Sequence, residues 1–161
     1  LLFETVAPLT MLVSVVVTYA LWPNCLRNGG STDGFKRKPV LLQHNANTIM
    51  SLTEVGLLGG LPVRYSDMAL APLFGIAYII FSWGMRFRWV PSGEPQFVYF
   101  FLDTTLGRTS TIALLVLVVI LTLFYVFFVC IDDLLLVLGG GKITHFGVVA
   151  TLSMMVCRFR D

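Results

Sequence analysis

Charged residues are scarce in this chain, and their scarcity excludes several classes of protein. Only 12% of the 161 residues are Asp, Glu, Lys or Arg, which is about half the fraction in an average soluble domain. The formal net charge is +2, and the 11 Lys and Arg residues are spread over several segments. Nucleic-acid binding needs a strong basic patch or stripe, so it is not expected here. The same composition argues against a soluble enzyme.

Cysteines and the common cofactor motifs are also few. The three cysteines, Cys25, Cys130 and Cys157, show no Cys-x-x-Cys or Cys/His spacing. Their odd number cannot form a closed set of disulfides, so we expect free thiols and no metal site. The chain contains no phosphate-binding loop, nucleotide fingerprint or zinc motif, which leaves no predicted cofactor other than a bound lipid or pigment.

Apolar residues are what the chain has in excess. They make up 57% of the sequence, and the mean hydropathy is +0.85, which predicts an all-α integral membrane protein. Residues 1–20 lack the basic start of a signal peptide, so they are interpreted as a span. A fifth apolar stretch, 143–157, is either a short span or an interfacial segment. We therefore predict one bundle of four to five transmembrane helices over residues 1–161. Four stretches approach the ~20 residues that cross ~30 Å of hydrocarbon: 4–22, 41–58, 66–85 and 109–131.

Basic residues divide unevenly between the two sides of this bundle. If all five stretches cross, only Arg64 and Lys142 lie on one side, and nine cations lie on the other. Without a fifth crossing the division is seven against four. Because Lys and Arg are retained in cytoplasmic loops, the richer side is predicted to face the cytoplasm, or the stroma or matrix of an organelle. On that side, residues 86–108 are predicted to form an aromatic interfacial loop. The nine cations are Arg27, Lys36, Arg37, Lys38, Arg86, Arg88, Arg108, Arg158 and Arg160.

A polar stripe runs along the second predicted span, 41–58. At 100° per residue the polar side chains of this helix fill an arc of roughly 140°. Such groups within hydrocarbon need partners, so the stripe is either a seam that packs against neighbouring helices or a ligand-binding site. His44 and Glu54 are ~15 Å apart along the helix axis, too far for one acid/base pair. The stripe consists of Gln43, His44, Asn47, Thr48, Ser51 and Glu54.

The order of several short motifs resembles that of a known family. The motifs are the run Leu42-Gln43-His44-Asn45-Ala46-Asn47-Thr48, a following Glu54, the turn Pro62-Val63-Arg64, the stretch 78–83 and the aromatic segment 93–102. Between about residues 3 and 138 they follow the pattern of the androgen-induced family of multi-span membrane proteins. Some members are threonine hydrolases that cleave fatty-acid esters of hydroxy fatty acids. The chain resembles a divergent member of protist or algal type.

The resemblance implies roles for two positions on the second span. His44 takes the place of the first histidine in the family pattern, and Asn47 takes the place of the second, which is the proposed catalytic base. An amide cannot accept a proton from a threonine hydroxyl near neutral pH, so only His44 remains as a catalytic base. The nucleophilic threonine belongs to a helix upstream of Leu1. Since the chain opens on Leu rather than Met, it is expected to be processed or part of a longer protein.

Three functional classes follow, and the first is favoured because Asn47 replaces the base. The chain is a non-catalytic protein that binds lipid or serves as an accessory subunit of a larger membrane complex, a lipid ester hydrolase that uses His44, or a pigment-binding subunit of a photosynthetic complex. The last would carry a chlorophyll-type pigment. By resemblance the protein belongs to the endoplasmic reticulum or another endomembrane, whereas the charge asymmetry fits a thylakoid or inner mitochondrial membrane equally well.

Overall fold

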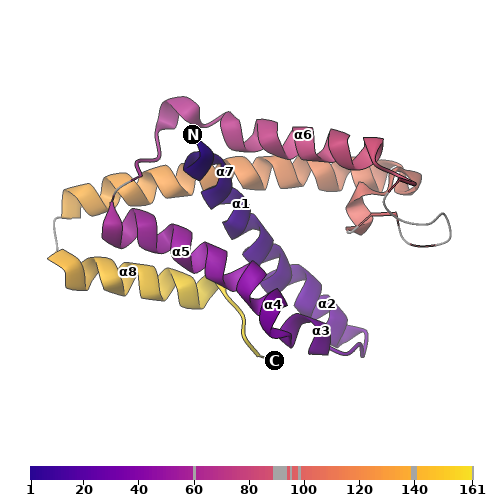
Figure 1. Ribbon diagram of the computed structural model, residues 1–161, viewed down its shortest axis with the longest axis horizontal. Coiled ribbons are helices and arrows are strands. Elements are labelled where there is room, and N and C mark those ends of the chain that lie inside the picture. Colours follow the sequence, from indigo (N-terminus) through magenta and orange to yellow (C-terminus); the bar gives the residue numbers. More distant parts are fainter. Residues whose placement is uncertain (60, 89–93, 95, 98, 139–140, 161) are drawn as a thin grey trace.

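The computed structural model describes residues 1–59, 61–88, 94, 96–97, 99–138 and 141–160. Every regular element in these described ranges is a helix, which confirms the predicted all-α class. The polypeptide forms a helical bundle (Figure 1). Of the predicted aromatic loop, Trp89, Pro91, Gly93 and Pro95 lie outside the described residues.

The first helix runs from α1 (Leu2–Val16) through a π-helical turn, η1 (Val17–Leu21), into α2 (Trp22–Arg27). A short helix, α3 (Asp33–Lys36), follows. The next long helix comprises α4 (Lys38–Leu41), η2 (Leu42–Ala46), α5 (Asn47–Thr53) and η3 (Glu54–Leu58). We refer to it as helix 38–58.

Helix 38–58 has clear start and stop signals. Pro39 lies in its first turn, where a missing N–H costs nothing and the fixed φ suits the helix. At its other end Gly59 adopts a left-handed conformation, with φ of 61°. Its N–H donates to the carbonyl of Glu54 at 2.7 Å. Glycine at this position ends the helix without the strain that a Cβ atom would add.

The second half of the chain contains the remaining helices. A short turn, η4 (Tyr65–Asp67), leads into α6 (Leu70–Gly84). Two further turns, η5 (Phe100–Leu102) and η6 (Thr104–Leu106), precede α7 (Arg108–Leu138). The last helix is α8 (Gly141–Val156). Helix α7 extends seven residues beyond the predicted end at Ile131, so Asp132 and Asp133 lie within the helix rather than after it.

Within the described ranges, three helices are long and apolar enough to cross a membrane: Leu2–Arg27, Tyr65–Gly84 and Arg108–Val137. They correspond to the first, third and fourth predicted spans. Helix α8 is apolar but shorter. Helix 38–58, the second predicted span, is not one of the three, and its polar stripe lowers its hydropathy. The described part of the chain is therefore an all-helical bundle with three candidate membrane spans.

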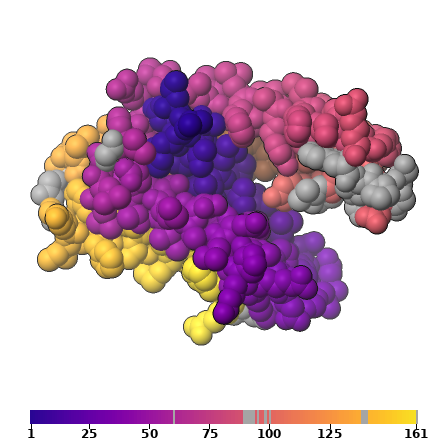
Figure 2. Space-filling view, in the orientation of Figure 1, coloured from indigo at the N-terminus to yellow at the C-terminus, as the bar shows by residue number. Residues whose placement is uncertain are grey.

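Helix α1 lies at the centre of the bundle (Figure 1). It contacts α7, α6 and α5, while α6 lies along α7, and α5 lies along α8. Figure 2 shows α1, in indigo, seated between the segments that form α6 and α5. Large aromatic side chains of α7 are fully buried against small and unbranched residues of α1. The core includes Ala7, Met11, Leu52, Ala71, Leu121, Tyr125, Phe128 and Val149.

Candidate functional site

The predicted polar stripe of helix 38–58 is divided between two environments. Thr48 and Ser51 are buried against α1. Gln43 and Asn47 are exposed, and His44 and Glu54 are half-buried. The six side chains therefore do not converge on one site.

The buried part of the stripe forms a hydroxyl ladder with α1, made of Thr10, Ser14, Thr48 and Ser51. The hydroxyl oxygens of Ser14 and Thr48 are 2.7 Å apart, and Thr48 donates to the carbonyl of Thr10 at 2.8 Å. The hydroxyls of Thr10 and Ser51 are 3.3 Å apart. Ser14 also donates to the carbonyl of His44. Small hydroxyl side chains let two helices approach closely and satisfy each other's polar groups, which is how polar residues pack membrane helices.

The side chains of Asn47 and His44 lie outside the hydroxyl ladder. Asn47 donates from Nδ2 to the backbone carbonyl of Gln43 at 3.2 Å, along the same helix. The Nδ1 atom of His44 is buried and has no hydrogen-bond partner within the described part of the chain. The hydroxyl ladder meets His44 only at its backbone carbonyl. No described threonine hydroxyl is hydrogen-bonded to the His44 ring, so the catalytic role remains a prediction.

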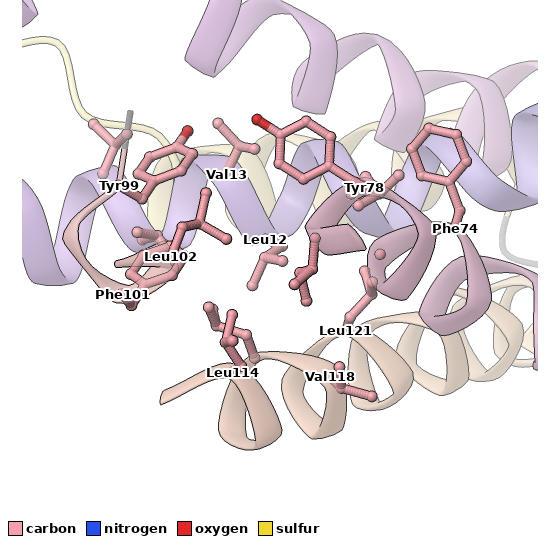
Figure 3. Close-up of a pocket in the computed structure, with 16 residues that line it drawn as sticks. Leu12, Val13, Phe74, Tyr78, Tyr99, Phe101, Leu102, Leu114, Val118 and Leu121 are labelled. Carbon is pink, nitrogen blue, oxygen red and sulfur yellow. The ribbon is translucent and has the colours of Figure 1, made fainter. Parts of the chain in front are cut away.

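A second feature, absent from the predictions, is an apolar cavity of about 290 Å³ between α1, α6, α7 and η5. Figure 3 shows Leu12 and Val13 of α1 facing Leu114 and Val118 of α7 across it. Aromatic rings from α6 and η5 complete the wall. The volume lies just below the range of ~300–1,000 Å³ that is usual for small-molecule sites. The wall also includes Phe74, Tyr78, Tyr99, Phe101, Leu102 and Leu121.

Two of the residues that line this cavity are tyrosines, which carry hydroxyl groups. Tyr78 of α6 and Tyr99, just before η5, both line the cavity and lie on either side of Val13 in Figure 3. Burial, and then the neighbouring Tyr78, raise the pKa of Tyr99 above its ordinary value. Tyr99 therefore stays protonated at neutral pH and can donate a hydrogen bond. Neither hydroxyl is hydrogen-bonded to another residue within the described ranges, so both are available to a ligand.

Two hydrogen bonds fix η5, which closes one end of the cavity. The indole Nε1 of Trp83 donates to the carbonyl of Leu102 at 2.9 Å. The hydroxyl of Ser110, on the first turn of α7, donates to the carbonyl of Phe101 at 2.6 Å. The rings of Tyr99 and Phe101 are stacked, with centroids 5.1 Å apart. These contacts tie the aromatic segment to both α6 and α7, so the cavity is part of the folded structure.

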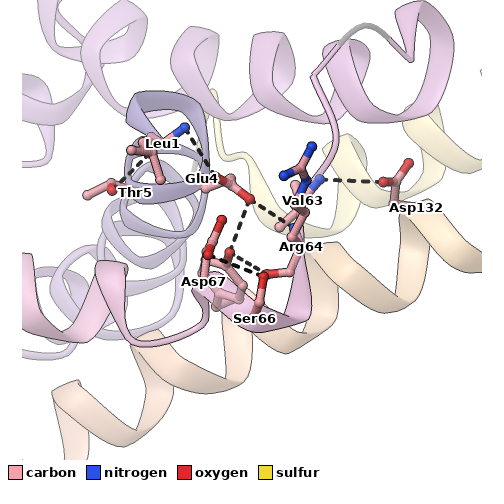
Figure 4. Close-up of polar contacts among 9 residues, drawn as sticks. Leu1, Glu4, Thr5, Val63, Arg64, Ser66, Asp67 and Asp132 are labelled. Carbon is pink, nitrogen blue, oxygen red and sulfur yellow. Dashed lines mark hydrogen bonds and ion pairs between the residues drawn. The ribbon is translucent and has the colours of Figure 1, made fainter.

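A third polar cluster surrounds Glu4, near the start of α1 (Figure 4). Glu4 is only 5% exposed. Its Oε1 accepts from the backbone N–H of Arg64 at 2.9 Å, and its Oε2 is 3.1 Å from the amino nitrogen of Leu1. The hydroxyl of Tyr125 donates to the carbonyl of Arg64 at 2.8 Å, and that hydroxyl lies 3.5 Å from Oε1 of Glu4. Glu4 and Tyr125 thus hold the connection between helix 38–58 and α6 against α1 and α7.

Within the described ranges, no three His, Cys, Asp or Glu side chains gather in a group that could hold a metal ion. Comparisons of the chain with protein-family models, curated proteins and solved structures found no match. The resemblance to the androgen-induced family and the roles it implies therefore stay predictions.

Proposed function

We propose that this protein is an integral membrane protein that binds a lipid, with an acyl chain in the cavity between α1, α6 and α7. The cavity itself is the observation that carries this proposal. Its wall is built from aliphatic and aromatic side chains of three helices that are apolar enough to span a membrane. A long apolar ligand gains about 0.8 kcal/mol for each CH₂ group removed from water. For a lipid that already lies in the bilayer, the favourable free energy of binding comes from closer packing against the cavity wall than among fluid acyl chains.

The two tyrosines support a lipid with a polar end. Tyr78 and Tyr99 place hydroxyl groups at the wall of an otherwise apolar cavity. A carboxyl, ester or hydroxyl group of a lipid could accept or donate a hydrogen bond there. A few polar groups in a mostly apolar site are what fix the orientation of a ligand. This proposal requires no chemical step and agrees with the non-catalytic reading of the sequence.

We also propose that helix 38–58 and α8 cross the membrane with the other three helices. From 38 to 58 the helix is roughly 30 Å long at 1.5 Å per residue, which matches a hydrocarbon core. It lies along α8 and contacts α1, a candidate span. Five crossings would place Arg64 and Lys142 on one side and the other nine cations on the opposite side, in agreement with the positive-inside rule.

A cavity-filling variant tests the lipid proposal. Leu12→Trp places a large ring where Leu12 faces the cavity, and Leu73→Trp adds the same ring at a position of α6 that is 60% exposed. Each protein is purified in mild detergent and examined by native mass spectrometry and by crosslinking to a photoactivatable fatty acid. We expect Leu12→Trp to lose the bound lipid and the crosslink, while Leu73→Trp keeps both. Equal binding by the two variants would refute the proposal.

A second candidate function is that of a subunit in a larger membrane complex. Gln43 and Asn47 are exposed on helix 38–58. Polar side chains that face hydrocarbon without a partner are costly, so a neighbouring protein would stabilise them. Native mass spectrometry of the same samples decides this point. An assembly of fixed stoichiometry that dissociates in Asn47→Leu supports a subunit, whereas a monomer in every sample argues against it.

A further inference from the structure

We propose that the end of the molecule formed by α2, α3, the start of α4 and the C-terminal segment binds anionic lipid headgroups. We call this surface the basic face. Its segments carry one acidic residue among the described positions, Asp33. The proposal concerns a surface separate from the cavity and does not depend on it. The cations of the basic face are Arg27, Lys36, Arg37, Lys38, Arg158 and Arg160.

The fold brings the C-terminal segment against the first helix and helix 38–58. The amide Nδ2 of Asn45 donates to the carbonyl of Arg158 at 2.7 Å, and the Thr18 hydroxyl donates to the carbonyl of Val156 at 2.8 Å. The thiol of Cys157 donates to the carbonyl of Asn45 at 3.7 Å. These contacts hold residues 157–160 against η1 and η2. Figure 1 shows the C-terminus beside α4 and close to α3.

An open cleft of about 460 Å³ lies between η1 and the C-terminal segment. Tyr19, Met155 and Phe159 provide apolar wall, and Arg158 and Arg160 provide positive charge. The Nε atom of Arg158 donates to the carbonyl of Arg160 at 3.1 Å, and its guanidinium carbon is 5.1 Å from the centre of the Trp22 ring. The stacking orients this guanidinium and leaves its terminal N–H groups without a hydrogen-bond partner among the described residues. A guanidinium held in this way suits a phosphate group.

The position of the basic face indicates a lipid rather than a soluble anion. The Leu2–Arg27 candidate span ends at this surface. Tyr19 and Phe159 are 62% and 55% exposed there. Aromatic side chains next to cations are typical of the level of the lipid headgroups. Groups of four to eight Lys and Arg at the cytoplasmic end of a span bind anionic lipids, and the described residues of this surface include six cations and one carboxylate.

Lipid selectivity measured with matched charge variants tests the proposal. The protein is reconstituted in nanodiscs that contain equal amounts of phosphatidylglycerol and phosphatidylcholine, and retained lipids are identified by native mass spectrometry. The test variant is Arg158→Gln/Arg160→Gln. The control is Arg86→Gln/Arg88→Gln, which removes the same charge from the connection between α6 and α7 on the side predicted to carry both pairs.

We expect the parent protein to retain phosphatidylglycerol preferentially. The test variant should bind it roughly tenfold to thirtyfold more weakly, since each cation near the surface contributes to the attraction. The control and the conservative variant Arg158→Lys/Arg160→Lys should keep most of the preference. An unchanged Tm of the test variant establishes that it is folded. If its Tm is lower, Arg160→Gln alone, which changes an exposed side chain, is measured instead.

Three results would overturn the proposal. The first is an equal loss of preference in the test and control variants, which would indicate a general effect of net charge. The second is displacement of the lipid by millimolar glycerol phosphate, which would make the phosphate group alone sufficient. The third is an acidic protein retained at this surface with no lipid preference.

Discussion

Gly56 provides the sharpest test of how helix 38–58 packs. A Cβ atom added at Gly56 would lie 2.3 Å from Cγ2 of Val149 on α8. Carbon atoms in contact are normally ~3.5–4.0 Å apart, so α8 would have to move by more than 1 Å. Val149 is buried and cannot turn away freely. Nδ1 of His145 is also 2.9 Å from the carbonyl of Gly56, which ties the two helices together at the same point.

We therefore expect Gly56→Ala to destabilise the protein. Overpacking of a close contact costs about 1–3 kcal/mol, and the better helix propensity of Ala offsets at most about 1 kcal/mol. With the full offset, the net loss is about 0–2 kcal/mol. For a chain of this size, each kcal/mol lowers Tm by about 2–4 °C. Thermal unfolding in mild detergent, followed by circular dichroism, measures this change.

Two further variants make the result specific to the contact. Gly147→Ala, on α8, adds a Cβ that has no atom within 4 Å, so it should leave Tm unchanged or raise it. In the double variant Gly56→Ala/Val149→Ala the new methyl group occupies space that Val149 has vacated. Its loss of stability should be smaller than the sum of the two single losses. If Gly56→Ala unfolds at the same temperature as Gly147→Ala, the close packing of helix 38–58 on α8 is wrong.

Three other predictions concern the polar clusters. Thr48→Val removes a buried hydroxyl that bonds two α1 residues and should lower stability by about 0.6–1.7 kcal/mol, whereas Asn47→Ala, at an exposed position, should change Tm little. Glu4→Ala leaves a backbone N–H unpaired and should cost about 1–3 kcal/mol; Glu4→Gln keeps an acceptor and should unfold at a higher temperature than Glu4→Ala. Hydrogen bonds from Thr105 hold the pKa of Asp103 below its usual range. The stability that these bonds contribute is complete above the ordinary Asp pKa of about 3.9 and is lost as pH falls through the lowered pKa. Thr105→Val should therefore raise the pKa of Asp103, measured by carbon NMR.

Each of the three outcomes has a clear contrary result. Equal Tm values for Thr48→Val and Asn47→Ala would mean that the hydroxyl ladder contributes nothing to stability. Equal unfolding of Glu4→Ala and Glu4→Gln would remove the hydrogen bond to Arg64 as a cause. An unchanged titration of Asp103 in Thr105→Val would show that the hydroxyl does not lower its pKa.

Hydropathy predicted the long apolar helices because their signal is carried by many residues. The first, third and fourth predicted spans correspond to the three helices that meet the length and apolarity of a membrane span. Ends were harder to predict. The fourth predicted span ends at residue 131, but α7 continues through Asp132 and Asp133 to Leu138, because a change in polarity does not interrupt backbone hydrogen bonding. Asp132 accepts a long hydrogen bond from the N–H of Val63 at 3.5 Å, so its polar group faces the connection before α6.

The polar stripe was predicted from one helix alone, and the buried face depends on two. Relative to His44, the polar arc runs from near 260° to near 40°, whereas Thr48, Leu52 and Asn45 lie near 40°, 80° and 100°. The second set is buried together with Ser51, which lies near 340° within the polar arc. Helix α1 selects this face because small and hydroxyl side chains at Thr10 and Ser14 allow close approach there. Nothing in residues 41–58 by themselves reports that choice.

The cavity could not be predicted for a related reason. Gly75 of α6 lies in the cavity wall, and a Cβ there would be 3.0 Å from Leu121. Its neighbours Phe74 and Tyr78 are large apolar residues of a span, and such residues look the same whether they face lipid, a partner helix or a cavity. Only the position of α1 and η5, which complete the wall, shows that these residues face a cavity.

Polar and apolar groups are arranged differently on the two sides of α1. This arrangement relates the packing of helix 38–58 to the proposed lipid cavity. Toward helix 38–58, hydroxyl groups bond across the interface and hold the helices close. Toward α6 and α7, Leu12 and Val13 of the same helix line the cavity. Because paired hydroxyls are satisfied internally, they leave no site for a polar ligand. The apolar cavity lies on the other side of α1, and it is there that we propose an acyl chain binds.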